Sequence, residues 1–412
     1  MAKSVKKDLN RALSSHTLAI NEILKILDEP AFSLQRVKWE EVIKLGDQIS
    51  KQATVAGMLW SGEEPKVGEL LDNMRLYCDM LQGFLLLCHG SMVGAGPTLC
   101  ACIRTSAKQV ADSSLSLLRQ AVSCYKLFNI TTRLLSQSSK SYLLLHKMIF
   151  ESTSHVIEGP FISSQNEDLK TLMPKLTGVV WEACAALKRT PTNNTTAVGR
   201  GITRVAASIK DVLREMGELK PAAGCSLDGS HEKGEGEDHN GDSCAQDGSP
   251  NDGNSGVSGA HLDIEDSSVI GDDLGDDLSN EEMMVAKLVT VVLSDTLLVF
   301  KELLRFISGL SRQSCNGCEG QVDHLERILE ICQGVGVQVD ELGASVYPPQ
   351  EASSSMAASI KIVGGMAGIE AELQRLGGAH EGLHVACEKL KISLRKLESE
   401  LGPLTMDLSN GF

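Results

Sequence analysis

The amino-acid sequence predicts an all-α protein in which two antiparallel helical-bundle lobes are joined by a disordered acidic linker. Hydrophobic residues make up 42% of the 412 residues and aromatic residues only 4%, a balance that favours helix packing over β-sheets. Apolar residues recur at three- and four-residue spacing through most of the chain. One long acidic stretch lacks this spacing and divides the chain in two.

The N-terminal lobe, residues 1–220, is predicted to contain six helices. They are expected at residues 4–27, 34–60, 66–90, 97–125, 172–188 and 195–219. The apolar stripe of the last helix consists of Val198, Ile202, Val205, Ile209, Val212 and Met216. Long amphipathic helices with short connections pack as antiparallel bundles. Helices from both halves of the chain could also share one core.

Residues 126–166 do not fit this pattern. They are rich in Ser, Thr and Ile and have no settled hydrophobic period, apart from one short apolar segment at Tyr142–Phe150. The sequence therefore predicts an irregular insertion in the N-terminal lobe. A genuine insertion and a translated unspliced segment both remain open as its origin.

Residues 221–279 are predicted to form the disordered acidic linker. Between Pro221 and Asn280 there are fifteen Asp and Glu against one basic residue, Lys233, so this stretch supplies 14 of the 15 net negative charges. It has too few apolar residues to offset the entropy of ordering. The apolar residues near its end are Leu262, Ile264, Val269, Ile270, Leu274 and Leu278. They allow a short docking motif among carboxylates, although composition favours chance apolar residues in a solvated linker.

The C-terminal lobe, residues 280–412, is predicted to be a bundle of four helices. Ser279 and Glu282 have the spacing of a capping box at the start of the first helix. Proline is expected to end the second helix at Pro348-Pro349 and the fourth before Gly402-Pro403. The third is expected at about residues 353–376, although it contains several glycines.

The first two of these helices, within residues 281–343, can be interpreted as a helix-loop-helix dimerisation element or as an ordinary hairpin inside the bundle. The leucine repeat from Leu383 to Leu401 likewise fits an exposed zipper or a helix packed in the core, and the core is favoured. If these helices offer a surface to a partner, the candidate contact residues are Leu288, Val292, Leu303, Leu390, Leu394 and Leu397.

Catalytic and metal-binding patterns are missing from the sequence. Gly94-Ala95-Gly96 and Gly334-Val335-Gly336 lack the further residues of nucleotide-binding loops and are interpreted as helix-end or packing glycines. Cys88 and His89 are adjacent and would point to different sides of a helix. Cys315 and Cys318 form only one of the two paired elements that a structural zinc site needs. We therefore expect a non-enzyme with no cofactor and no metal.

The N-terminus has basic residues without a following apolar region, and we find no run of about 18 apolar residues. We expect a protein that is neither secreted nor membrane-inserted, with its twelve cysteines reduced. No basic stripe suited to a phosphate backbone is present, so we expect no direct binding of nucleic acid.

Three segments together resemble the cyclin-D-binding protein family, which includes the helix-loop-helix protein Maid and its relatives. They are Val179-Val180-Trp181-Glu182-Ala183-Cys184, the helix end from Ile209 to Met216, and the stretch from Asp340 to Pro349, with the acidic linker between the second and third. The resemblance implies a non-enzymatic regulator that binds D-type cyclins and helix-loop-helix transcription factors, restrains cell-cycle progression and resides in cytoplasm and nucleus.

The residues ahead of Met283 are acidic, which agrees with a family that sequesters partners without touching DNA. A structural scaffold or cytoskeleton-associated adaptor is the alternative function, because long antiparallel bundles also serve such roles.

Overall fold

The computed structural model describes residues 2–31, 35–61, 67–135, 169–220, 278–312, 320–377 and 381–409. Helices are the regular elements throughout these ranges, which confirms the all-α prediction. The predicted linker lies outside the described residues except for Leu278 and Ser279, and so do residues 136–168 and the Cys315–Cys318 pair.

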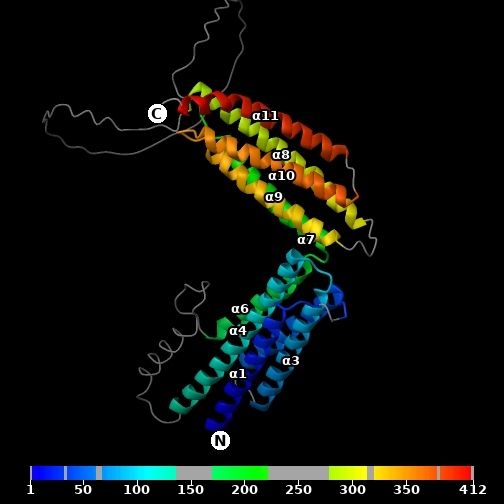
Figure 1. The fold of residues 1–412 in the computed structure, drawn as a ribbon. Helices are drawn as coiled ribbons and strands as arrows, with labels where there is room; N and C mark the ends of the chain where they lie inside the picture. The colour runs from blue at the N-terminus through cyan, green and yellow to red at the C-terminus, as the bar shows by residue number, and fades with distance from the viewer. Residues whose placement is uncertain are drawn as a thin grey trace, which may run out of the picture.

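The helices form two bundles that meet where α7 begins (Figure 1). The first contains α1 (Ala2–Ile26), α2 (Trp39–Ser61), α3 (Val67–Ser91), α4 (Pro97–Leu135) and α6 (Leu169–Ala186), which a short 3-10 helix, η1 (Leu187–Arg189), follows. The second contains α7 (Asn194–Met216), α8 (Asn280–Arg312), α9 (Gln321–Ala344), α10 (Ala352–Arg375) and α11 (Glu381–Ser409). Each bundle encloses its own hydrophobic core, called here the first core and the second core.

Two helices continue past their predicted ends. α4 runs to Leu135, beyond residue 125, because no Gly or Pro follows Pro97 to stop it. The first part of the predicted irregular insertion is therefore helical. α11 passes through Gly402-Pro403 to Ser409. A proline removes only one backbone donor, and the burial of Leu397 and Leu401 on one face of α11 holds the preceding turns in place.

α7 belongs to the second core, although the sequence placed it in the N-terminal lobe. Its buried residues Val198, Ile202 and Ile209 pack with those of α8 and α9. Around the second core the helices follow the order α7, α8, α11, α10, α9 and back to α7. α8 and α9 barely touch each other, since α7 bridges them. The predicted hairpin of residues 281–343 is thus not packed as a hairpin.

Glycines bring α9 close to both of its neighbours. A Cβ atom added at Gly336 would lie 2.6 Å from Val205 Cγ1, and one at Gly343 would lie 2.5 Å from Val212 Cγ1, both on α7. On α10, a Cβ at Gly365 would lie 2.6 Å from Val335 Cγ2. Real Cβ contacts are not this short, so the missing side chains allow the close approach. Gly365, one of the glycines expected to weaken α10, instead serves its packing, and Gly336 is a packing glycine as the sequence predicted.

α8 is the one helix in the described ranges that is long and apolar enough, over Asn280–Leu310, to cross a membrane by length and composition. The sequence analysis did not single it out. Half of its most apolar window is buried, and its apolar residues fill the second core. It also carries Asp295, 3% exposed, which accepts a hydrogen bond from Ser393 at 2.6 Å and pairs with Lys389 at 2.9 Å. The core helix of a soluble protein passes the same test.

Side chains of the second bundle cap the first turn of α4. Glu326 on α9 accepts hydrogen bonds from Thr98 N at 2.9 Å and from Thr98 Oγ1 at 2.5 Å. Asn194 of α7 accepts from Gly96 N at 2.8 Å and donates to Gly94 O at 3.0 Å. The first N–H groups of a helix have no partner within it, and a carboxylate there also suits the helix dipole. These bonds tie the two bundles together.

We expect Gly336→Ala to lower the free energy of unfolding by about 1–3 kcal/mol, because the new methyl group overpacks the contact with α7. Gly334→Ala is the matched control: nothing lies within 4 Å of its Cβ, and higher helix propensity should raise stability by roughly 0.5–1 kcal/mol. Urea denaturation followed by circular dichroism measures both. Equal stability of the two variants would contradict the close contact.

Glu326→Ala should cost about 1–2 kcal/mol of stability, the usual effect of removing a helix N-terminal cap. Glu330→Ala, at an exposed position one turn along α9, should stay within about 0.5 kcal/mol of the wild type. Chemical denaturation compares them. If Glu326→Ala is as stable as its control, the cap does not hold the bundles together.

Candidate interaction surface

The six residues predicted as partner contacts lie mostly inside the second core. Val292, Leu303, Leu390, Leu394 and Leu397 are all 0% exposed, and Leu288 is partly buried against the same core. The leucine repeat of α11 packs on α8, which covers it. These side chains therefore belong to the bundle interior and do not form an exposed zipper while the bundle has this fold.

α8 has a second apolar stripe that the sequence analysis missed. Met284 and Val291 are 55% and 47% exposed, and Leu298 continues the same seven-residue spacing. Residues seven apart lie on nearly the same side of a helix. The sequence already shows that this helix is apolar on two sides, but the sequence analysis considered only one apolar face.

This stripe leads into a groove of about 830 Å³ between α7 and α8. Its walls are formed by Thr203, Ala206, Ala207 and Lys210 of α7 and by Ser294, Leu297, Leu298, Lys301, Leu304, Arg305, Ser308 and Gly309 of α8. Small side chains on α7 leave this space opposite the leucines of α8. The volume is within the range of about 300–1,000 Å³ that binding pockets have.

The floor of the groove is apolar because its hydroxyl groups are already hydrogen-bonded to their own helices. Thr203 donates to Gly199 O at 2.8 Å, and Ser294 donates to Thr290 O at 2.8 Å. Ser308 bonds one turn back in the same way. The lining of the groove is mostly apolar.

The rim of the groove is positively charged. Lys210, Lys301 and Arg305 line it and no carboxylate does. Arg305 pairs with Glu302, whereas Lys210 and Lys301 have no carboxylate partner in the part of the chain that the structure describes. An apolar floor with a basic rim suits an amphipathic segment whose polar side is acidic.

The buried thiols are not activated for chemistry. Burial raises the pKa of Cys88 above the usual range, and the His89 ring nitrogen Nε2 lies 3.1 Å from Glu29 O instead of facing a thiol. Burial likewise raises the pKa of Cys78 and of Cys332 to about 12. A nucleophile needs the thiolate form, which these environments disfavour.

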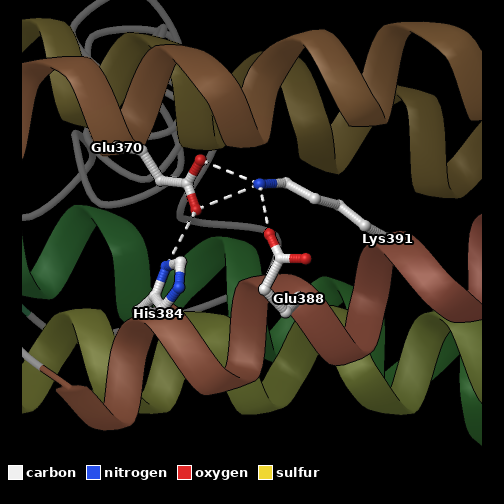
Figure 2. A network of polar contacts seen from close by, with 4 residues as sticks. All are labelled: Glu370, His384, Glu388 and Lys391. Atoms are coloured by element: carbon white, nitrogen blue, oxygen red, sulfur yellow. Dashed lines mark hydrogen bonds and ion pairs between the residues drawn. The ribbon is translucent and has the colours of Figure 1, made fainter.

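Glu370, His384 and Glu388 form the one group among the described residues whose ligand atoms lie close enough to hold a metal ion, within 4.8 Å of one another. Figure 2 shows the Lys391 ammonium directed between the two carboxylates. Its nitrogen lies 3.0 and 3.2 Å from the Glu370 oxygens and 2.9 Å from Glu388 Oε1. This hydrogen bond lowers the pKa of Glu388. The Lys391 ammonium thus supplies the positive charge that the two carboxylates need. The cluster joins α10 to α11.

Glu372 is a second charged cluster, between α9 and α10. Its side chain is 8% exposed, lies 2.6 Å from His324 Nδ1 and pairs with Arg375 and, at 3.9 Å, with Arg327. Burial raises the pKa of this carboxyl, but the hydrogen bond from His324 and the two guanidinium charges outweigh burial, so the pKa is lowered. The ionised form therefore stabilises the fold.

We expect Glu372→Gln to destabilise the protein by roughly 1–3 kcal/mol at neutral pH, because a neutral amide replaces the buried carboxylate and loses its ion pairs with His324 and Arg375. A folded pKa below the ordinary value stabilises above that value, and the stabilisation is lost as pH falls through the folded pKa. The difference between wild type and variant should thus shrink from about pH 7 to about pH 3. Denaturation at each pH measures it, with exposed Glu330→Gln as control. A difference that grows with acid would contradict this assignment.

The fold and the groove define the class: a helical-bundle protein with two cores and an open, basic-rimmed groove on the second. Residues 41–222 match the N-terminal family model described as Grap2 and cyclin-D-interacting, and residues 270–371 match its C-terminal counterpart. The chain belongs to the Grap2 and cyclin-D-interacting protein family, which confirms the resemblance found in the sequence. A search of curated proteins finds no match.

Proposed function

We propose that this protein is a non-enzymatic regulator that binds D-type cyclins through the groove between α7 and α8. The groove is the observation that carries the proposal, because it offers apolar contacts and unpaired positive charges at one place on the second core. The family description, which names interaction with cyclin D, supports the choice of partner. Met284 and Val291 extend the same apolar surface along α8.

The regulatory effect we propose is negative. A cyclin held on this surface would be withheld from its other partners, and cell-cycle progression would slow. Binding of helix-loop-helix transcription factors is proposed on the family resemblance. Since α7 separates α8 from α9, such factors would meet the outer surface of the second core and would not exchange a hairpin with it. We propose residence in both cytoplasm and nucleus, where these partners act.

The alternative is a structural scaffold or cytoskeleton-associated adaptor. The two bundles joined by the Glu326 cap would provide a rigid spacer for that role. Cosedimentation with filaments distinguishes it from the regulator, which should stay in the supernatant and bind cyclin in a one-to-one complex.

The decisive measurement is the affinity of the purified full chain for a D-type cyclin, compared with Leu298→Asp. A carboxylate on the groove floor should weaken binding at least about tenfold, because it places charge where apolar side chains must bury. Val337→Asp, at a position 61% exposed on α9, is the control and should bind like the wild type.

Circular dichroism confirms that each variant is folded. Deleting residues 280–412 is a poorer experiment, because α7 would lose the helices that cover its apolar face. Absence of cyclin binding by the wild type and by a chain in which a Gly-Ser sequence replaces residues 259–277 refutes the proposal, and equal binding by both variants moves the site away from the groove.

A further inference from the structure

Both ends of the acidic segment that connects α7 to α8 are held at one place. Leu278 N donates a hydrogen bond to Lys220 O at 3.1 Å, and Leu278 is buried in the second core at 1% exposure. Lys220 and Leu278, the described residues on either side of this segment, therefore lie together beside the end of α7 and the start of α8. These are the two helices that form the groove.

An exposed stripe on α8 leads from this point to the groove. It passes Met284, Lys287 and Val291 before reaching Leu298. From residue 278 to residue 298 the helix rises about 30 Å at 1.5 Å per residue. Residues 262–277, if extended, reach about 50 Å at roughly 3.3 Å per residue. The last part of the segment is long enough to lie in the groove.

The chemistry of this segment complements the groove. Leu262, Ile264, Val269, Ile270 and Leu274 are apolar, and seven Asp and Glu are interspersed with them between residues 262 and 277, without a Lys or Arg. The groove has the opposite pattern, with a floor of leucines and a rim that carries Lys210, Lys301 and Arg305 without a carboxylate. Apolar side chains can fill the floor while carboxylates pair with the rim.

We propose that residues 259–277 of this chain dock in the groove between α7 and α8. Both ends of the tether are fixed on the two helices that form the groove and within reach of it, so the effective concentration of the segment there is on the order of millimolar. Even a weak intrinsic affinity then fills the groove for much of the time. The segment thereby competes with the protein partner, a consequence that rests on the proposed cyclin-binding function, whereas the docking itself does not.

The test uses a fluorescent peptide of residues 259–277 and the full-length protein in which the same residues are replaced by a Gly-Ser sequence of equal length. The peptide should bind this linker-replaced protein, measured by fluorescence anisotropy. It should bind the wild type at least about tenfold more weakly, because the tethered segment already occupies the groove. No binding to the linker-replaced protein, or equal binding to both proteins, overturns the proposal.

Charge-reversal variants show where on the protein the peptide binds. In the linker-replaced protein, Lys210→Glu with Lys301→Glu should abolish peptide binding, since both lysines line the rim. Lys361→Glu with Lys396→Glu makes the same charge change at exposed positions on α10 and α11 and should leave binding unchanged. Equal loss in both pairs would mean that binding follows net charge alone, which contradicts docking in the groove.

Two further readouts separate the alternatives. Light scattering should find the wild type monomeric, and a dimer that disappears on linker replacement would assign the segment to the groove of a second copy and overturn the intramolecular proposal. Cyclin affinity should rise on linker replacement. If neither protein binds cyclin while the peptide result holds, the cyclin-binding function fails and the docking stands.

Discussion

The close packing of α7 against α9 is the constraint on which the rest of the molecule depends. Val205 and Val212 occupy the space that side chains at Gly336 and Gly343 would fill, and α7 also packs against α8. Because α7 precedes the acidic segment and α8 follows it, the second core is built from both sides of that segment. Folding of the second core therefore holds the two ends of the acidic segment, Lys220 and Leu278, at one point.

The groove and the junction between the bundles both follow from this arrangement. The outer side of α7 carries small residues and Lys210, so that its contact with α8 leaves an open channel instead of a filled seam. At its other end, α7 begins with Asn194, which meets the loop before α4 beside Glu326 of α9. One helix thus contributes to the second core, to the binding surface and to the joint between the bundles.

The charged groups buried near the second core serve its packing. Lys391 neutralises Glu370 and Glu388, while Arg375, Arg327 and His324 surround Glu372. Each cluster joins neighbouring helices and satisfies its own charges, as buried charges require. Lys210 and Lys301 on the rim of the groove, by contrast, have no carboxylate partner among the residues that the structure describes. This contrast favours the groove as the place where another segment binds.

Local patterns in the sequence determined the helices. Hydrophobic spacing located them, and the capping box at Ser279 and Glu282 is present as two reciprocal bonds, of 2.9 and 3.2 Å. Only the tertiary structure decided which helix covers which apolar face. Periodicity shows that Leu390 and Leu394 lie on an apolar side, but not that α8 buries them, and it placed α7 with the wrong neighbours. Which helix covers an apolar face depends on contacts between residues far apart in the chain. The periodicity of a single helix does not indicate these contacts.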